Sequence, residues 1–467
     1  MPNSRLSFAR RRTVCAPKLS KIRQSSRSER SPGVTATELH RTIDAVWRIE
    51  SAKVVAAVAR IVRDVGVAEE VAQDALVTAL ERWPATGIPD NPGAWLMATA
   101  KNRALDRLRQ WQLHARKEGE LTREIEDQLT MAAPDLEADV QAALEGQIDD
   151  DMLRLVFTAC HPVLSEEARV ALTLRLIGGL TTDEIARAFL LPEPTIAQRI
   201  VRAKRTLSAA RVPFEIPHAN ELEARLSSVL EVIYLIFNEG YSATGGSDWM
   251  RPQLVEEALR LGRMVAELVP AEPEVHGLVA LMEIQASRVR ARSGPSGEPI
   301  LLLDQNRAQW DHLLIQRGLA ALARAEALSD EHDGLGAYAL QAAIAAYHAR
   351  ARVPEDTDWA GIAALYDALA QIAASPVVEL NRAVAVSMAF GPAAGLELID
   401  AIAGEPQLKN YHLLPSVRGD LLAKLGRSHD ASAEFIRAAG LTRNTREKQL
   451  LLDRAAACVR QSPSQRN

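Results

Sequence analysis

Arginines and polar side chains recur along one face of a helix predicted to begin near Thr195. Guanidinium groups donate paired hydrogen bonds to phosphate oxygens and guanine edges, so this face suits contact with DNA. The opposite face carries Ile196, Ile200, Ala203 and Leu207 at helical spacing. A cationic outer face and an apolar inner face are typical of the second helix of a helix-turn-helix. The candidate DNA-binding residues here are Thr195, Gln198, Arg199, Arg202, Arg205 and, near the edge of the face, Lys204.

The segment before this helix must hold it in place. Thr181 and Glu184 have the spacing of a capping box, which predicts that a helix starts there. The sequence LPEP at residues 191–194 ends that helix, because proline removes a donor and disfavours helix in the residue before it. Pro194 is tolerated in the first turn of the next helix. Residues 180–207 therefore predict a helix-turn-helix, and the alternative is an ordinary helical hairpin with a solvated basic face.

Length and composition set broad limits. A chain of 467 residues, 47% of them hydrophobic, suffices for about three domains. It has no run of about 18 apolar residues and no apolar signal core at its N-terminus, so we expect no membrane contact. Cys15, Cys160 and Cys458 match neither a disulfide framework nor a zinc pattern. The sequence predicts a cytoplasmic protein.

The charge is segregated along the chain, although the net charge is only −5. Residues 1–35 hold nine Arg and Lys against one Glu, a net of +8, and residues 97–117 hold six against one Asp, a net of +5. Residues 118–150 hold eleven acids against one Arg, a net of −10. Basic segments separated by an acidic one indicate two surfaces that face nucleic acid.

Residues 38–116 have helical periodicity throughout. The first predicted helix breaks at residues 64–66, and the second spans Ala68 to Trp83. The segment from Pro84 to Pro92 is rich in Pro, Gly and Asn, so we expect it not to be helical. A third helix, from Gly93 to Arg116, begins apolar and turns basic.

The second half of the chain predicts paired helices. Residues 217–462 are rich in Ala and Leu, and Gly- or Pro-containing turns divide them into segments of helix-hairpin length. Gly419, Ala431, Phe435 and Ala438 resemble the small and aromatic positions of a tetratricopeptide repeat. We therefore expect an α-solenoid with a concave surface. The whole chain is predicted to be all-α.

Two blocks together resemble a known family. AEEVAQDAL, Trp83 and AWLMATAKNRALDRLRQ look like region 2 of bacterial sigma factors of the extracytoplasmic-function (ECF) group. Residues 180–207 resemble region 4 of the same group, although Pro192 stands where a Ser or Thr cap is common. The order of the blocks and the acidic segment between them also fit. The resemblance divides the chain into a disordered basic tail (1–37), region 2 (38–116), an acidic linker (117–148), region 4 with its helix-turn-helix (149–212) and a helical tetratricopeptide-like domain (213–467).

This resemblance implies a protein that binds core RNA polymerase and directs it to promoter DNA. It assigns the region 4 helix that starts near Thr195 to the −35 element, and assigns other residues to the −10 element or to the polymerase. A further protein or signal partner is expected for the solenoid, which would be regulatory. The implied polymerase-binding residues are Glu70, Gln73, Asp74 and Leu76, and the implied −10 residues are Ile88, Asp90, Asn91, Asn102, Arg103 and Arg107.

No pattern of residues indicates catalysis. Cys160 and His161 are adjacent, but two ligands without a second pair make a weak metal site, and the end of a core helix is favoured. We expect no enzyme activity, cofactor or metal. Two other functions remain open: a helix-turn-helix repressor or activator that is not a polymerase subunit, and a solenoid interaction scaffold. Co-purification with core polymerase separates the three.

Overall fold

The computed structural model describes residues 36–118, 147–189, 191–243, 245–246, 249–329 and 334–461. The predicted basic tail (1–37) and acidic linker (117–148) lie almost wholly outside these ranges. The described residues form helices, short turns and two strands of two residues each, which confirms the all-α fold class. No helix within these ranges is long and apolar enough to cross a membrane.

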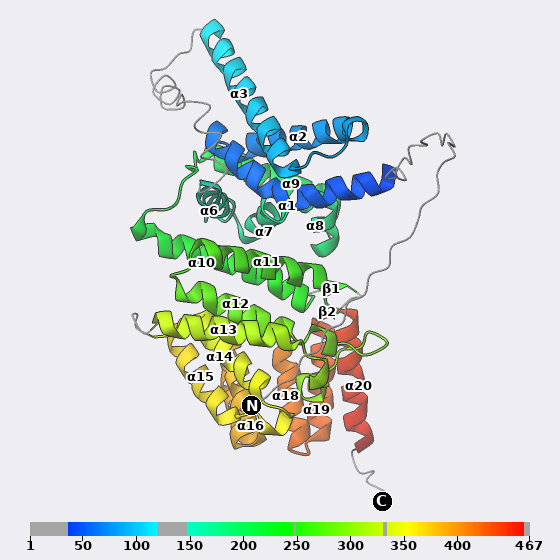
Figure 1. Cartoon of the computed structure of the whole chain (residues 1–467). Coiled ribbons are helices and arrows are strands. Elements are labelled where there is room, and N and C mark those ends of the chain that lie inside the picture. The colour runs from blue at the N-terminus through cyan, green and yellow to red at the C-terminus, as the bar shows by residue number, and fades with distance from the viewer. Residues whose placement is uncertain are drawn as a thin grey trace, which may run out of the picture.

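Three helices form the first part of the chain (Figure 1). The connection between the first two is tight, because Arg63 adopts a left-handed conformation with φ of 57°. Asp64 then caps the second helix, and its Oδ1 accepts hydrogen bonds from the N–H groups of Gly66 (2.7 Å) and Val67 (2.9 Å). The helices are α1 (Ala36–Val62), α2 (Val65–Thr86) and α3 (Pro92–Glu118).

The second helix is longer at both ends than predicted. Gly66 does not break it but lies in its first turn, and Pro84 lies inside its last turn. The prediction that Pro84 to Pro92 are not helical is therefore wrong for Pro84 to Thr86, and also for Pro92, where the third helix begins. A proline this close to a helix end costs one backbone hydrogen bond. The last turn still closes, because the Gly87 N–H bonds to the Trp83 carbonyl (2.9 Å) and the Thr86 hydroxyl bonds to the Arg82 carbonyl (3.0 Å).

Four helices lie within the described part of residues 147–209, and the last two form the predicted helix-turn-helix. The capping box is present: the Thr181 N–H donates to Glu184 Oε2 (2.8 Å), and the Glu184 N–H donates to Thr181 Oγ1 (3.1 Å). Pro192 occupies the cap position of the second helix and supplies no side-chain hydrogen bond, in line with the departure noted in the sequence. The helices are α6 (Gln147–Ala159), α7 (Glu166–Leu176), α8 (Thr182–Phe189) and α9 (Glu193–Ala209).

The remaining described helices lie below these, the first of them across the view and the later ones more steeply inclined (Figure 1). In the α18–α19 hairpin, Gly419 lies against the buried ring of Phe435, as the repeat-like pattern predicts. Five short 3-10 turns, η1 (Val289–Ala291), η2 (Leu302–Asp304), η3 (Arg307–Gln309), η4 (Pro354–Asp356) and η5 (Pro406–Leu408), connect some of the helices. The helices are α10 (Ala219–Tyr241), α11 (Pro252–Leu268), α12 (Pro273–Ala286), α13 (His312–Ser329), α14 (Ala337–Arg350), α15 (Trp359–Ile372), α16 (Pro376–Phe390), α17 (Pro392–Ile402), α18 (Leu413–Lys424), α19 (Ser428–Leu441) and α20 (Thr445–Gln461).

The C-terminal part of this helical stack contacts its N-terminal part. Strand β1 (Gly245–Gly246) follows α10, and strand β2 (Arg443–Asn444) precedes α20, and the two pair in parallel. Asn444 Nδ2 also donates to the carbonyl oxygen of Ala243 (3.2 Å). The last helix is thereby tied to the end of α10.

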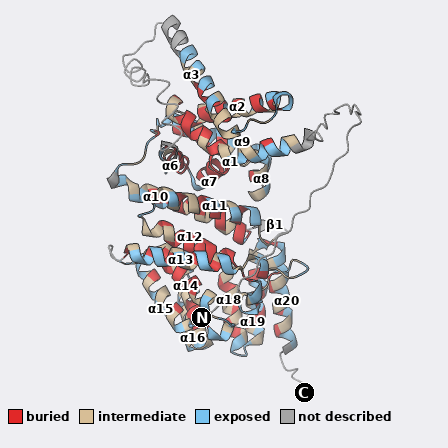
Figure 2. Cartoon of the chain, viewed as in Figure 1, coloured by how far each residue is buried: buried red, intermediate tan, exposed pale blue. Residues whose placement is uncertain are grey.

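One continuous core joins the described helices from α1 to α12 (Figure 2). It includes fully buried side chains from regions that lie far apart in sequence, such as Val58 of α1, Leu174 of α7 and Leu261 of α11. The two blocks that resemble sigma regions therefore pack on each other, and the second of them also packs on the first solenoid helices.

Candidate nucleic-acid interface

Helix α9 has the two faces that its sequence predicts. Its apolar stripe is buried, and Thr195, Gln198, Arg202 and Arg205 are exposed. Arg199 is half-buried. Four of the six predicted DNA-binding side chains of this helix are thus available at the surface. The buried stripe consists of Ile196, Ile200, Ala203 and Leu207.

Lys204 makes an ion pair within the protein. Its Nζ pairs with the carboxylate of Glu69 in α2. Glu69 Oε1 also accepts hydrogen bonds from Arg175 Nε of α7 (2.6 Å) and from Gln73 Nε2 (2.7 Å). Glu69 is only 5% exposed. This buried carboxylate therefore joins α2 to both α7 and α9.

Two further ion pairs join the same two parts of the chain. Arg48 Nη2 of α1 lies 2.7 Å from Glu184 Oε1 of α8. Arg60 Nε of α1 lies 3.0 Å from Asp151 Oδ2 of α6. Asp151 is buried, and burial raises the pKa of its carboxyl although Arg60 and Arg154 act in the opposite direction. Helices α6 to α9 are thus held against α1 and α2 by charge contacts at three places.

The predicted −10 and polymerase residues face each other across α2 and α3. Arg103 Nη2 donates to Thr78 Oγ1 (2.7 Å), and its Nη1 lies 3.5 Å from Asp74 Oδ2. Arg107 Nη2 lies 3.1 Å from Glu70 Oε2. All four charged side chains are more than a third exposed, so each pair contributes about 0–1 kcal/mol to stability and is easily exchanged.

The other predicted residues of this region differ in exposure and in their contacts. Asn102 and Asp90 are exposed, and Ile88 and Leu76 are half-buried against the core. Asn91 acts as a helix cap, because its Oδ1 accepts a hydrogen bond from the Ala94 N–H (3.0 Å). In this structure the Asn91 side chain holds the start of α3.

Cys160 and His161 lie at the end of α6. Cys160 Sγ is 3.3 Å from Thr173 Oγ1, and burial raises the pKa of its thiol to about 11. His161 Nδ1 accepts from the Val163 N–H (3.1 Å), and burial with nearby Arg225 lowers the pKa of the imidazole to about 4. Among the described residues no group of three or more His, Cys, Asp or Glu could hold a metal ion.

Glu69 is the interface residue that the sequence did not single out. It is a second glutamate beside Glu70, and its burial depends on Arg175 and Lys204, which are more than 100 residues away. Helical periodicity gives the face of a residue but not the partner that covers it. Within α2, the position of Glu69 falls beside the apolar stripe, near that of Leu76, whereas the position of Glu70 falls on the opposite face, so periodicity could have placed Glu69 nearer the core.

Comparisons with known families agree with this layout. Residues 48–112 match the family described as Sigma-70 region 2, and residues 154–207 match Sigma-70, region 4. Residues 225–326, from α10 into α13, match a family of unknown function (DUF6596).

Several proteins are similar to this chain. An uncharacterised protein of Rhizobium meliloti is 42% identical over 405 residues, which are 86% of this chain and 93% of the relative. The ECF RNA polymerase sigma factor SigK of Mycobacterium ulcerans is 33% identical over 156 residues, 32% of this chain and 75% of the relative. The probable ECF RNA polymerase sigma factor SigI of Mycobacterium tuberculosis is 27% identical over 232 residues, 48% of this chain and 76% of the relative. No solved structure gives a significant match.

Proposed function

Since the chain belongs to the ECF RNA polymerase sigma factors and directs transcription initiation, we propose that it binds core RNA polymerase through α2 and reads promoter DNA through α3 and α9. The observation that carries this proposal is the two-faced helix α9, with its apolar stripe in the core and its polar residues outside. Helix α9 would enter the major groove at the −35 element, where Arg199 and Arg202 contact phosphates or guanine edges.

The −10 element would be read by the α2–α3 loop and by the basic side of α3. Asp90 and Asn102 are exposed there. Arg103 and Arg107 would exchange their weak pairs with Asp74 and Glu70 for phosphate contacts. The same exchange would free Asp74 and Glu70 for the polymerase. DNA binding and polymerase binding by region 2 would therefore support each other.

The two reading surfaces must move apart for this function. The −10 and −35 elements are about 25 base pairs apart by their names, which is about 85 Å along B-form DNA. In the structure α9 touches α2 through Lys204 and Glu69, and α2 packs against α3. We propose that this closed arrangement is the free protein and that regions 2 and 4 separate on the polymerase.

The test is transcription in vitro with purified core polymerase and a mapped promoter. Arg202→Ala should lower transcription about tenfold, since a lost base contact costs about 1–3 kcal/mol, and should leave polymerase co-purification intact. Arg324→Ala, an exposed arginine on α13, is the matched control and should transcribe normally. Normal transcription by the Arg202 variant would contradict the assignment of α9 to the −35 element.

A second variant tests the polymerase surface. Asp74→Lys combined with Gln73→Ala should abolish co-purification with core polymerase while the circular dichroism spectrum stays that of a folded helical protein. A folded double variant that still binds polymerase would contradict the assignment of α2. Binding of duplex promoter DNA without polymerase would instead support a repressor or activator.

A further inference from the structure

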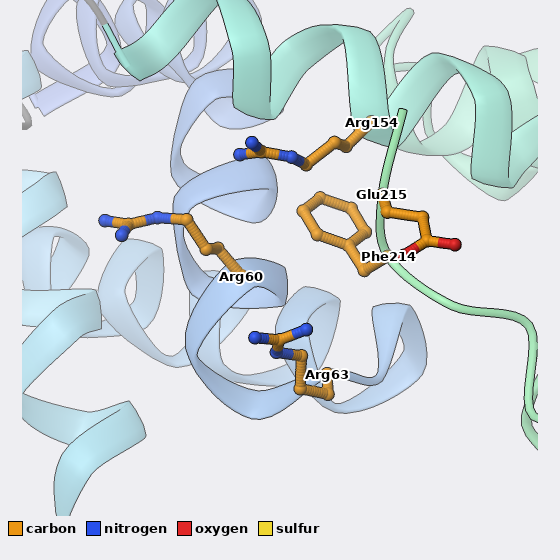
Figure 3. Close-up of a pocket in the computed structure, with 5 residues that line it drawn as sticks. All are labelled: Arg60, Arg63, Arg154, Phe214 and Glu215. Atoms are coloured by element: carbon orange, nitrogen blue, oxygen red, sulfur yellow. The ribbon is translucent and has the colours of Figure 1, made fainter. Parts of the chain in front are cut away.

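A pocket of about 300 Å³ lies where region 2, region 4 and the segment between α9 and α10 meet (Figure 3). Arg60 belongs to the last turn of α1, and Arg63 to the turn after it. Arg154 belongs to α6 of region 4. Phe214 and Glu215 come from the segment that connects α9 to α10. Nothing in the proposed transcription function uses this pocket.

Two of the three arginines are held in place by one buried carboxylate. Asp151 Oδ2 lies 3.0 Å from Arg60 Nε, and Asp151 Oδ1 lies 2.6 Å from Arg154 Nη1. Each of these bonds occupies one of the five N–H donors of its guanidinium group. The remaining donors stay available in a fixed orientation. Asp151 thus orients two cations but neutralises only one of them.

The third arginine has no partner of its own. The Arg63 side chain makes no hydrogen bond or ion pair with the described residues, and in Figure 3 its guanidinium group points toward Phe214 and Arg154. The carboxylate of Glu215 points away from the three guanidinium groups. Three positive charges therefore stand against the carboxylates of Asp151 and Glu215, which leaves a local excess of one, and only Asp151 is paired with the arginines.

The backbone at the pocket is also unusual. Arg63 and Arg211 are the two non-glycine residues with positive φ in the described chain, 57° and 48°. Both follow the ends of helices whose connecting segments lead into the pocket. Glycine adopts this conformation without a steric penalty. At Arg63 this conformation follows the last turn of α1, which the Arg63 N–H closes by bonding to the Ala59 carbonyl (2.8 Å), and it fixes the direction in which the chain leaves the helix beside the pocket.

We propose that this pocket binds a small phosphate-bearing molecule with two or more negative charges. Guanidinium groups match the geometry of phosphate oxygens, and three of them at one pocket suit a phosphate dianion or a diphosphate group. The volume lies at the lower end of the range for small-molecule sites, which suits a ligand of this size.

The ligand would act on the closed arrangement. Arg60 and Arg63 belong to region 2, whereas Arg154 and Phe214 belong to region 4 and its linker, so one anion bridges both. A ligand that binds only when the two regions are together favours that state. This regulatory consequence rests on the proposed function, in which the regions separate on polymerase, and the ligand would hold the free protein closed.

The binding test uses the full chain and inorganic pyrophosphate as the probe, measured by calorimetry at constant ionic strength. The parent should bind in a one-to-one ratio, and Arg63→Gln should bind at least tenfold more weakly. Arg63 is exposed and unpaired with the described residues, so its substitution leaves the core intact. Arg350→Gln removes an exposed arginine of α14, in the other half of the molecule, and should bind like the parent.

Hydrogen exchange tests the bridging. Pyrophosphate should slow amide exchange at the Arg60–Asp151 contact between α1 and α6 in the parent and not in Arg63→Gln. Equal affinity of Arg63→Gln and the parent, or equal weakening in Arg350→Gln, would overturn the site. Weaker binding of duplex DNA by Arg63→Gln with no pyrophosphate binding by the parent would assign the pocket to a DNA phosphate and overturn the small-molecule proposal. None of these readouts needs polymerase, so they stand apart from the test of the proposed function.

Discussion

Glu69 is the residue at which α2, α7 and α9 converge. Its carboxylate is buried and shared by Arg175 and Lys204, whose side chains are 22% and 21% exposed. Breaking a buried ion pair leaves uncompensated charge, which costs about 3–5 kcal/mol when the remaining partner is fully buried. The partial exposure of both cations reduces the expected cost.

We therefore expect Glu69→Gln to lower the free energy of unfolding by about 1–3 kcal/mol, measured by urea denaturation. The matched control is Glu70→Gln, the neighbouring glutamate, whose exposed pair with Arg107 should cost about 0–1 kcal/mol. Equal effects of the two substitutions would show that the Glu69 contact does not hold the regions together.

A second prediction at this scale concerns pH. Burial, together with Arg288 and Arg307, lowers the pKa of His348 to about 4, from an ordinary value of about 6.5. Between these values the unfolded chain binds a proton that the folded chain excludes, so stability is lost as the pH falls from 6.5 toward 4.

His348→Gln should therefore make the urea midpoint fall less between pH 7 and pH 5 than it does in the parent. His429→Gln, which alters a fully exposed side chain, is the control. A parent-like pH dependence in the His348 variant would contradict the buried neutral imidazole.

At the scale of elements, the sequence correctly predicted the features that depend on residues close together in the chain. The Thr181–Glu184 capping box and the apolar stripe of α9 depend on residues within a few turns of each other, and both are confirmed. The ends of α2 were mispredicted, because Gly66 and Pro84 disfavour helix. The Asp64 cap keeps Gly66 in the first turn, and the bond from the Gly87 N–H to the Trp83 carbonyl keeps Pro84 in the last turn.

Two glycines in the α18–α19 hairpin give a matched test of packing. A Cβ at Gly419 would lie 3.0 Å from Phe435 Cε1 and 3.2 Å from the carbonyl oxygen of Ala431, whereas one at Gly440 would meet nothing within 4 Å. Both glycines are in helices, where alanine is favoured by about 0.5–1 kcal/mol.

Gly440→Ala should therefore raise the thermal midpoint. Gly419→Ala should lower the free energy of unfolding by about 1–2 kcal/mol, because the ring and the backbone beside it are tightly placed. A stabilising Gly419→Ala would show that α18 and α19 can shift apart and that the small residue is not required there.

At the scale of the whole molecule, the core connects parts that the sequence presents as separate blocks. Val156 and Ile177 of region 4 line a small cavity with Ile233 of α10 and Leu261 of α11. Arg260 Nη2 of α11 also donates to the Ile177 carbonyl (2.8 Å). Periodicity predicted that these side chains are buried but not which helices cover them. The domain boundaries expected from the sequence therefore do not mark independent cores.

This continuity predicts the effect of removing the solenoid. Truncation after Arg211 exposes the apolar faces of α6 and α7 that α10 and α11 cover. We expect the fragment to lose promoter-dependent transcription with purified core polymerase, and to unfold at a lower urea concentration than the full chain. Activity above that of the full chain would show that the solenoid is an inhibitor and overturn its supporting role.

The pairing of β1 with β2 also has a consequence during synthesis. Asn444 bonds to Ala243, 201 residues earlier in the chain. At about 5–20 residues per second, a ribosome needs about 10–40 s to pass from one to the other. Regions 2 and 4 have left the ribosome long before this pairing can form. Each new molecule therefore passes through an interval in which regions 2 and 4 have been synthesised but the β1–β2 contact, which ties α20 to the end of α10, has not yet formed.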